Sequence, residues 1–515
     1  MDELRIGQIV EGMTLRQKLG QLIISRPNIN GVKETVRAGE IGGFYFAGTA
    51  LGNLKESIEE FKSLSPFPLF FAQDLELGKT GGGPTWPSAM AVSSADSPED
   101  AYLWAYCHAR QARSFGINAV FGPVLDISLN PLAENTGFRS VGDDPERVAE
   151  YCEGMMRGYA DAGVYSFAKH YPGFGRAAGD PHMELAVLDS DYGTLYGEEL
   201  LPYRKAIDSK AIAGIMSGHV IAKAVDGLPT TVSKKWIDIL RKDLSFEGLV
   251  MTDSLSMQGI LQYDNSKYLY ENTLIAGHDM FLSNFHLTHG ECLDLLEDAV
   301  KQGRLSLEAV EEKVRRILAV KYWLEEFVPL PWSEDENRRV YDRISRKAPS
   351  YLRCDGKAFR SLESDLSHYF IVFTNDQAAI SGELSDTAEG ANGIVQALTA
   401  KLPNIKIDFL PLCPQAGQIQ KTLNTSLGYD KITVIANTTC FSYTGFDCLS
   451  YQAQSIIRAL RHKTDTLVIV GNPYAYKAVE EYVKQVLFAY NLGYDVIADV
   501  LSGELKPNGK LPIML

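Results

Sequence analysis

Ionisable side chains stand at the ends of several short apolar runs in the first two-thirds of the chain. They are Asp74, Asp126, Lys169, His170, His219 and Asp253. Singly, an Asp in such a place is usually a helix N-cap and a His is usually a hydrogen-bonded structural residue. If these groups came together in the folded chain, they would repel or desolvate one another unless a polar ligand satisfied their hydrogen bonds. The set therefore predicts a polar pocket equipped with carboxylates and imidazoles, which can act as acids, bases and nucleophiles.

The apolar runs themselves lack period-two alternation, which is typical of strands buried on both faces. Eight of them occur, at residues 19–24, 41–48, 69–75, 119–127, 164–170, 211–219, 248–254 and 278–284. The segments between them, such as 145–163, carry apolar residues at helical spacing. Strands that alternate with helices in this way predict a closed (β/α)₈ barrel. Because barrel enzymes carry catalytic residues at the carboxyl ends of the strands, we expect the ionisable groups on that rim.

The length of 515 residues exceeds one ordinary domain but suits a barrel of about 250 residues or more with a smaller second domain. We predict the barrel at residues 1–335 and, at 336–350, a polar, Pro-containing linker that could contain one short helix. A doubly wound α/β sandwich is expected at 351–515, where buried runs again alternate with helical segments.

Composition narrows the function classes. The net charge of −15 argues against a nucleic-acid binder, which needs a clustered basic surface. No run is long enough to cross a membrane, and residues 1–14 lack the basic and apolar regions of a signal peptide, so a cytoplasmic protein is expected. Seven scattered cysteines without a C-x-x-C pair indicate neither a disulfide framework nor a zinc site.

Several segments together resemble one known family. The chain reads KHYPGFGRAAGDPH at 169–182 and GLVMTDSLSMQGI at 248–260. Further matching segments are 11–23, 130–146, 276–284 and 503–515. With them the chain resembles glycoside hydrolase family 3, particularly its β-N-acetylglucosaminidase branch.

The resemblance implies a role for individual residues. Asp253 corresponds to the family's nucleophile, and the Asp-x-His pair Asp180 and His182 corresponds to the acid/base of the hexosaminidase branch. Family sugar-binding positions fall on Asp74, Arg139, Lys169 and His170. The resemblance implies no cofactor and no metal.

Two departures from the branch lie near the expected pocket. The branch usually has a second His and an Asp where this chain has Phe174 and Arg176, and an E-G-G-R-V segment where it reads ELGKTGGG at 76–83. They leave open whether an N-acetyl group is required, and Arg176 is predicted to adjust substrate choice.

The implied chemistry is that of a retaining glycosidase, in which a carboxylate attacks the anomeric carbon and an acid protonates the leaving oxygen. Lys169, His170 and His219 would favour the ionised form of Asp253, and His219 is counted with the substrate-binding rim. An Asp beside the acid His would fix its tautomer and favour its protonation. The glycines at 173–179 would let this loop move, so acid delivery is expected to depend on loop closure.

The sequence thus predicts an exo-acting β-N-acetylhexosaminidase or a close relative that cleaves a small glycoside or glycopeptide. A β-glucosidase or β-xylosidase with a pocket altered at Phe174 and Arg176 is an alternative. Phosphorolysis is another, because a neutral imidazole would not repel phosphate and Arg176 could attract it. A catalytically silent sugar-binding protein is the non-enzymatic alternative. The sugar, the natural aglycone and the oligomeric state cannot be read from the sequence.

Overall fold

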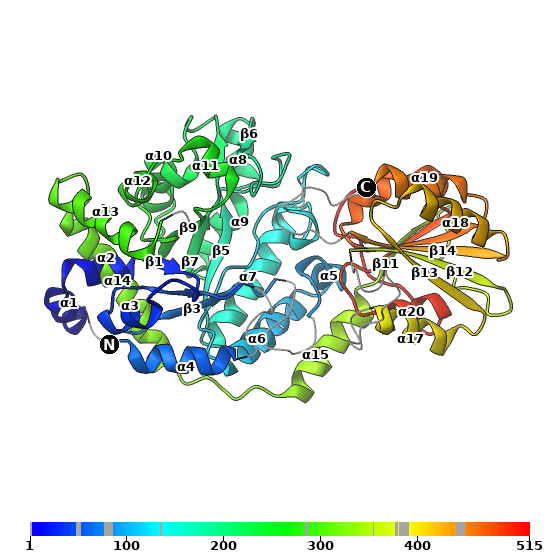
Figure 1. Cartoon of the computed structure of the whole chain (residues 1–515), viewed down its shortest axis with the longest axis horizontal. Coiled ribbons are helices and arrows are strands. Elements are labelled where there is room, and N and C mark those ends of the chain that lie inside the picture. Colours follow the sequence, from blue (N-terminus) through cyan, green and yellow to red (C-terminus); the bar gives the residue numbers. More distant parts are fainter. Residues whose placement is uncertain are drawn as a thin grey trace. The chain divides into compact units, whose positions relative to one another are not determined.

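The computed structural model describes residues 3–47, 53–76, 86–133, 136–283, 287–353, 355–375, 380, 391–438 and 449–515. The chain forms two compact units (Figure 1). The first comprises Met1–Pro84, Ala101–Thr136 and Asp144–Arg338, and the second comprises Thr85–Asp100, Gly137–Asp143 and Arg339–Leu515. The second unit therefore includes two short segments from within the range that the sequence assigned to the barrel.

The first unit contains a closed barrel of eight strands, in the order β1-β10-β9-β7-β5-β4-β3-β2. The strands are β1 (Ile23–Ser25), β2 (Gly43–Tyr45), β3 (Phe70–Gln73), β4 (Ala119–Val120), β5 (Tyr165–Tyr171), β7 (Gly214–Ser217), β9 (Leu249–Ser254) and β10 (Met280–Leu282). Every neighbouring pair is parallel. Each strand overlaps one of the eight apolar runs, so the predicted barrel is confirmed.

Helices alternate with these strands along residues 3–326. They are α1 (Glu3–Gly12), α2 (Leu15–Gln21), α3 (Val32–Ala38), α4 (Leu54–Leu64), α5 (Ala89–Ser94), α6 (Pro98–Ser114), α7 (Pro145–Asp161), α8 (Tyr192–Gly197), α9 (Leu201–Asp208), α10 (Lys234–Asp238), α11 (Gln258–Tyr263), α12 (Leu269–Ala276), α13 (His289–Lys301) and α14 (Leu307–Glu326). In α7, Asp144 caps the first turn by accepting from the Glu146 N–H, and Pro145 occupies the first helical position. Its buried residues recur every three or four positions, which places one apolar face against the barrel.

A small two-stranded parallel sheet was not expected from the sequence. It pairs β6 (Ala186–Leu188) with β8 (Val220–Ala222). β6 follows the loop after β5, and β8 directly follows His219 after β7. The sheet therefore joins the excursions that follow two adjacent barrel strands, on the rim where the ionisable residues were predicted.

The second unit contains a six-stranded sheet in the order β11-β16-β15-β14-β12-β13. The strands are β11 (Ser350–Arg353), β12 (His368–Thr374), β13 (Ile405–Pro411), β14 (Lys431–Thr438), β15 (Thr464–Gly471) and β16 (Gln485–Phe488). All neighbours are parallel except β11, which pairs antiparallel with β16. The helices are α17 (Ala391–Lys401), α18 (Ala416–Ser426), α19 (Tyr451–Ala459) and α20 (Tyr494–Ser502). The predicted α/β second domain is confirmed, with β11 as an additional edge strand.

The stretch predicted as a linker is largely helical. α15 (Glu334–Lys347) covers most of residues 336–350, with three acidic residues in its first turn and Arg346 and Lys347 in its last. This charge distribution favours a helix because it opposes the helix dipole at both ends.

Among the described residues, no helix combines the length and the apolar character that a membrane crossing requires.

Candidate active site

The carboxyl ends of the barrel strands bring together most of the predicted site residues. Lys169 and His170 lie in β5 and Asp253 lies in β9, while Asp74 directly follows β3 and His219 follows β7. Since all eight strands are parallel, these positions share one rim of the barrel.

Asp253 lies in a positive environment. Its Oδ2 is 3.7 Å from Nε2 of His170. Burial acts to raise the pKa of Asp253, but the positive electrostatic influence of the neighbouring imidazoles and of Lys169 outweighs it, so the pKa lies below its usual value. The carboxylate is therefore held in its ionised form, as a nucleophile requires.

His170 is oriented by a buried carboxylate. Its Nδ1 donates to Oδ2 of Asp126 at 2.6 Å, which leaves Nε2 on the side of Asp253. Oδ1 of Asp126 also accepts from the backbone N–H of Phe174 at 2.9 Å. The sequence marked Asp126 as a strand-end residue but assigned it no role. In the structure it fixes both the His170 ring and the beginning of the next loop.

Lys169 joins two acidic residues on the opposite side of the rim. Its buried ammonium lies 2.8 Å from Oδ1 of Asp74 and 2.5 Å from Oε1 of Glu76. The hydroxyl of Tyr45, at the end of β2, donates to Oδ2 of Asp74. Burial and the charges of Asp74, Glu76 and Asp253 raise the pKa of Tyr45, so it remains a hydroxyl donor. These contacts hold Asp74 in place with charged hydrogen bonds.

His219 supports the nucleophile strand from within the protein. Its Nε2 donates to the carbonyl of Ser254 at 2.9 Å, and its Nδ1 lies 2.7 Å from the Thr231 hydroxyl. Burial lowers the pKa of His219, which favours the neutral ring that accepts from Thr231. Both ring nitrogens are thus engaged beside Asp253, and the substrate contact proposed for His219 from the sequence stays a prediction.

The loop after β5 carries the Asp-x-His pair. Nδ1 of His182 donates to Oδ1 of Asp180 at 2.7 Å, and the same oxygen accepts the backbone N–H of His182 at 2.9 Å. Asp180 is buried, whereas His182 is half-buried. The electrostatic influence of His182 is among those that lower the pKa of Asp253.

This loop is docked on the start of α11, five residues beyond the nucleophile. The carbonyls of His182 and Pro181 accept from the backbone N–H groups of Gln258 and Gly259, at 3.1 and 3.2 Å. A Cβ at Gly259 would lie 2.6 Å from the Pro181 carbonyl oxygen and 2.7 Å from that of Glu184. Only glycine therefore permits this close backbone approach.

The two positions that depart from the branch pattern both contact protein groups. The Phe174 ring packs on His170 with the ring centroids 5.2 Å apart. The Arg176 guanidinium pairs with Glu198 and with the buried Glu199. Because its guanidinium is engaged by these two carboxylates, the predicted influence of Arg176 on substrate choice stays a prediction.

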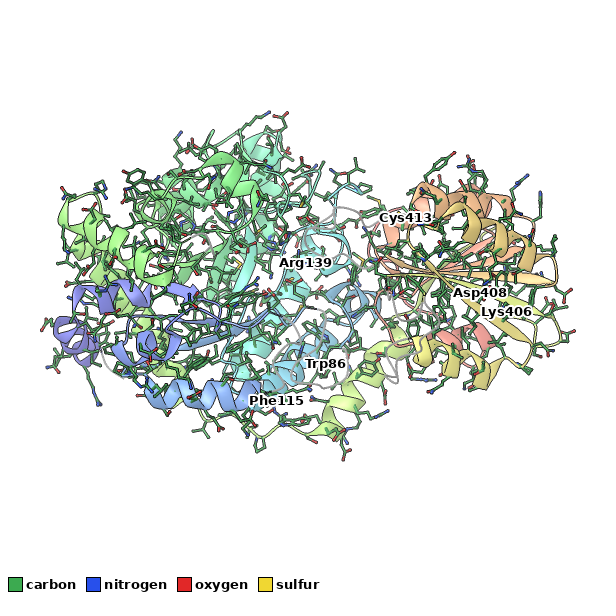
Figure 2. All side chains as sticks on the ribbon, viewed as in Figure 1. Trp86, Phe115, Arg139, Lys406, Asp408 and Cys413 are labelled. Carbon is green, nitrogen blue, oxygen red and sulfur yellow. The ribbon has the colours of Figure 1, made fainter. Side chains whose placement is uncertain are left out.

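Arg139 is the remaining residue to which the sequence assigned a sugar-binding role. It ends the short helix η1 (Gly137–Arg139), is half-buried and belongs to the second unit (Figure 2). Its predicted sugar-binding role stays a prediction. Among the described residues, no group of three or more His, Cys, Asp or Glu side chains could hold a metal ion.

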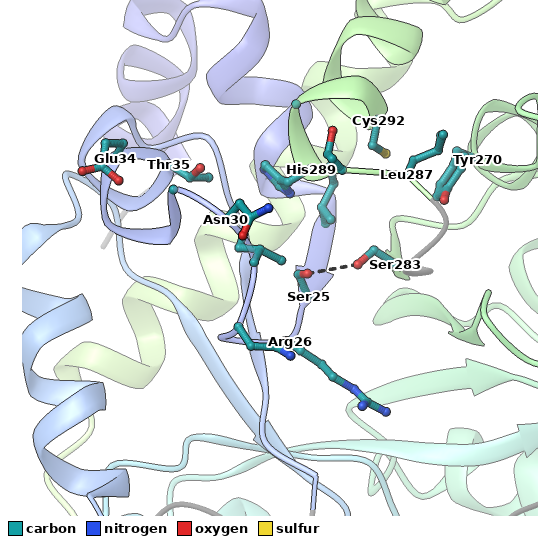
Figure 3. Close-up of a pocket in the computed structure, with 16 residues that line it drawn as sticks. Ser25, Arg26, Asn30, Glu34, Thr35, Tyr270, Ser283, Leu287, His289 and Cys292 are labelled. Atoms are coloured by element: carbon teal, nitrogen blue, oxygen red, sulfur yellow. Dashed lines mark hydrogen bonds between the residues drawn. The ribbon is translucent and has the colours of Figure 1, made fainter.

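A separate cavity of about 680 Å³ lies at the ends of β1 and β10 (Figure 3). Ile23 and Ser25 line it, and Ser25 accepts a 3.1 Å hydrogen bond from Ser283. Because strand side chains alternate between faces, Ile24 points to the other side of the barrel wall. The remaining lining comes mainly from the loop after β1 and from α3, α12 and α13, so the cavity faces the helix layer and does not include the candidate catalytic residues.

Comparison with known proteins places the chain in a family. The model of the glycosyl hydrolase family 3 N-terminal domain matches residues 14–320, which include the whole barrel. The chain belongs to glycoside hydrolase family 3. The resemblance seen in the sequence is confirmed, and the protein is a glycoside hydrolase.

The relatives of this family 3 chain match between 59% of it and nearly its whole length. Beta-hexosaminidase LpqI of Mycobacterium tuberculosis is 31% identical over 326 residues, which are 59% of this chain and 82% of LpqI. A family 3 beta-N-acetylglucosaminidase from Paenibacillus superimposes with a TM-score of 0.86 and 26% identity, over 98% of this chain and 99% of that one. Beta-glucoside phosphorylase BglX superimposes with a TM-score of 0.86 over 99% of this chain and 95% of that one, but at 22% identity it shows the shared fold alone.

Proposed function

We propose that this family 3 enzyme is a retaining exo-β-glycosidase of the β-N-acetylhexosaminidase type. The observation that carries the proposal is a His182 that is oriented by Asp180 and whose loop is docked on the start of α11, five residues beyond an Asp253 with a lowered pKa. The similarity to LpqI and to the Paenibacillus enzyme supports this sugar class over a glucoside or xyloside. The substrate would be a small glycoside or glycopeptide with a terminal β-linked sugar.

In the first displacement, the Asp253 carboxylate attacks the anomeric carbon as the glycosidic C–O bond breaks. His182 donates its proton to the departing oxygen. Because Nδ1 of His182 faces the Asp180 carboxylate, this transfer is assigned to Nε2. The negative charge of Asp180 favours the imidazolium form that the step consumes.

In the second displacement, water attacks the anomeric carbon from the face that the leaving group occupied, and the bond to Asp253 breaks. His182, now neutral, takes the proton from the water. Two displacements restore the β configuration. Asp74, Lys169 and His170 are proposed to hold the sugar hydroxyls, because they line the same rim and present charged hydrogen-bonding groups.

Phosphorolysis is the second candidate, since a histidine acid/base does not repel phosphate and the phosphorylase BglX shares the fold. The cation that the sequence offered for attracting phosphate was Arg176, and it pairs with Glu198 and Glu199. This pairing favours hydrolysis.

The cytoplasmic location expected from the sequence stays a prediction.

A panel of nitrophenyl β-glycosides tests the proposal. N-acetylglucosaminide, glucoside and xyloside should be compared at one leaving group, with and without inorganic phosphate. We expect the N-acetylglucosaminide to have the highest kcat/KM, and NMR to show the β anomer of the free sugar first. A sugar 1-phosphate formed only with phosphate would establish phosphorolysis, and no turnover of any member would overturn the assignment.

A further inference from the structure

Arg176 and Glu199 form an ion pair at the beginning of the loop that carries Asp180 and His182. Nε of Arg176 lies 2.5 Å from Oε1 of Glu199, and the guanidinium also reaches Glu198 through Nη2. The Glu199 side chain is 1% exposed and the Arg176 side chain 31%. Among the described residues, Arg176 is the basic side chain that pairs with Glu199.

Glu199 also packs directly on Gly173, the second residue of the loop after β5. A Cβ at Gly173 would lie 3.2 Å from Cβ and 3.3 Å from Cγ of Glu199, and Gly173 has a φ of +129°. The aliphatic part of Glu199 thus holds Gly173 while its carboxylate holds Arg176. The backbone carbonyl of Arg176 accepts from the side-chain amide of Asn130 at 3.0 Å. Residues 173–176 are therefore fixed at both ends by side chains from outside the loop.

This fixed segment continues into the catalytic residues on both sides. Within the segment, Phe174 is anchored separately: its backbone N–H donates to Asp126, which orients His170, and its ring packs on His170. Downstream, the backbone N–H of Gly179 donates to the Leu132 carbonyl at 3.0 Å, immediately before Asp180. A shift of Arg176 would therefore be transmitted downstream to the acid/base pair, while Phe174 keeps its own contacts with Asp126 and His170.

We propose that Arg176 is a positioning residue: through its ion pair with Glu199 it fixes the base of the acid/base loop, so that His182 is held where it delivers its proton. The inference rests on the proposed function of His182. It gives Arg176 a role different from contact with the sugar. Glu199, in the connection between α8 and α9, is a positioning residue in the same way.

The chemistry of the pair explains why arginine and glutamate suit it. A carboxylate as buried as that of Glu199 is costly unless it is paired, so loss of Arg176 leaves an uncompensated charge under the loop. The planar guanidinium contacts two carboxylates at once, whereas a lysine ammonium is a single point charge on a flexible stem. Arg176→Lys should therefore keep only part of the effect.

The test compares two leaving groups on the same sugar. Arg176→Ala and Glu199→Gln should each lower kcat for an alkyl N-acetylglucosaminide by about 10- to 100-fold, a part of what general acid catalysis contributes. The nitrophenyl N-acetylglucosaminide, whose leaving group needs little protonation, should change by less than about threefold under the same reasoning. Arg176→Lys should lie between wild type and Arg176→Ala.

Arg304→Ala is the matched control. Arg304 pairs with Glu271 and Asp298, and its side chain is 36% exposed beside a Glu271 that is 8% exposed, but the pair lies at α12 and α13. Arg304→Ala should leave the ratio of kcat for the alkyl N-acetylglucosaminide to kcat for the nitrophenyl one unchanged. Thermal unfolding of each variant establishes whether it is folded, and if Arg176→Ala does not fold, Glu199→Gln and Arg176→Lys decide the matter.

The ratio of kcat/KM for the N-acetylglucosaminide to kcat/KM for the glucoside, measured with the same leaving group, separates a positioning role from a role in sugar recognition. It should stay constant in Arg176→Ala. A changed sugar preference, or equal loss with both leaving groups, would overturn the positioning role while the proposed function stands. Failure of the proposed function would show itself differently, as a wild-type enzyme that turns over neither aryl nor alkyl N-acetylglucosaminide.

Discussion

Nε2 of His170 lies 3.7 Å from Oδ2 of Asp253, while the other ring nitrogen is bonded to the buried Asp126. The imidazole thus connects a fixed carboxylate with the proposed nucleophile. This arrangement places the ionisation of the nucleophile under the control of His170 on β5 and of Asp126 in the segment after β4.

Asp253→Asn tests the nucleophile. An amide cannot form the covalent intermediate, so kcat should fall roughly 10⁴-fold or more for aryl and alkyl substrates alike, as is usual when a nucleophile is removed. Steady-state rates and the melting temperature should be measured together. A folded variant with wild-type rates would show that the nucleophile lies elsewhere.

Asp126→Asn tests the orientation of His170. The substitution keeps the shape of the side chain but removes the charge that holds Nδ1, and hydrogen bonds to charged groups are worth about 1.5–3 kcal/mol. We expect kcat/KM to fall about 10- to 100-fold, equally for good and poor leaving groups, because the nucleophile and the sugar contacts are affected rather than the proton donor. Asp294→Asn, an exposed carboxylate on α13, is the control and should have no such effect. A loss confined to poor leaving groups would contradict this role.

Lys169→Met tests the electrostatics of Asp253 by pH. The pKa of Asp253 is lowered, so kcat/KM of the wild-type enzyme should fall only as the pH drops through a value below the ordinary Asp pKa of about 3.9. Removing the ammonium takes away a positive charge and leaves Asp74 and Glu76 without this partner. Both changes raise the pKa of Asp253, so the acid limb should move to higher pH.

Acid unfolding must be separated from this titration. The lowered pKa of Asp253 stabilises the folded state above the unfolded-state pKa, and this contribution is lost as the pH falls through the folded-state value. Each sample should therefore be returned to neutral pH and assayed again. An acid limb that stays in place in Lys169→Met would show that Lys169 does not favour the ionised nucleophile.

The barrel and its rim could be predicted from the sequence because buried parallel strands leave uninterrupted apolar runs. Asp74, Lys169 and Asp253 stand at the ends of such runs, so their meeting follows from the geometry of a closed parallel sheet. The contacts between side chains could not be predicted in this way. Tyr45 and Glu76 are joined to Asp74 and Lys169 only by the pairing of neighbouring strands and by side-chain conformation.

The surroundings of the acid/base loop were harder still to predict. Glu199 is 23 positions from Arg176 in the sequence and lies in no recognisable motif. The paired strands β6 and β8 are short and show little hydrophobic pattern. α15 was foreseen only as one short helix that the linker could contain, because its polar, charged sequence is that of an exposed helix as much as that of a linker. Such features depend on tertiary contacts, which local sequence does not encode.

His182→Ala tests the proton donor. A nitrophenolate departs with little protonic help, whereas an alkyl oxygen needs a proton in the transition state. The variant should therefore lose about 10²- to 10⁴-fold in kcat on the alkyl N-acetylglucosaminide and far less on the nitrophenyl one. Asp180→Asn should give a milder version of the same pattern, because the ring survives but loses its charged partner. If both substrates slow by the same factor, the proton comes from another residue.

Gly259→Ala tests whether docking of the loop on α11 matters for acid catalysis. The new Cβ would lie 2.6 and 2.7 Å from two backbone oxygens of the loop, which cannot turn aside as a flexible side chain could. The loop must therefore retreat from α11, and His182 moves with it, while Asp253 and the sugar-binding rim stay in place. We expect kcat on the alkyl substrate to fall about 10-fold or more and the nitrophenyl rate to change little, by the same reasoning on leaving groups. Gly7→Ala in α1 is the matched control, because a Cβ there meets nothing within 4 Å and alanine favours a helix. A Gly259→Ala enzyme that handles both substrates as Gly7→Ala does would mean that His182 reaches the leaving group without the docked loop.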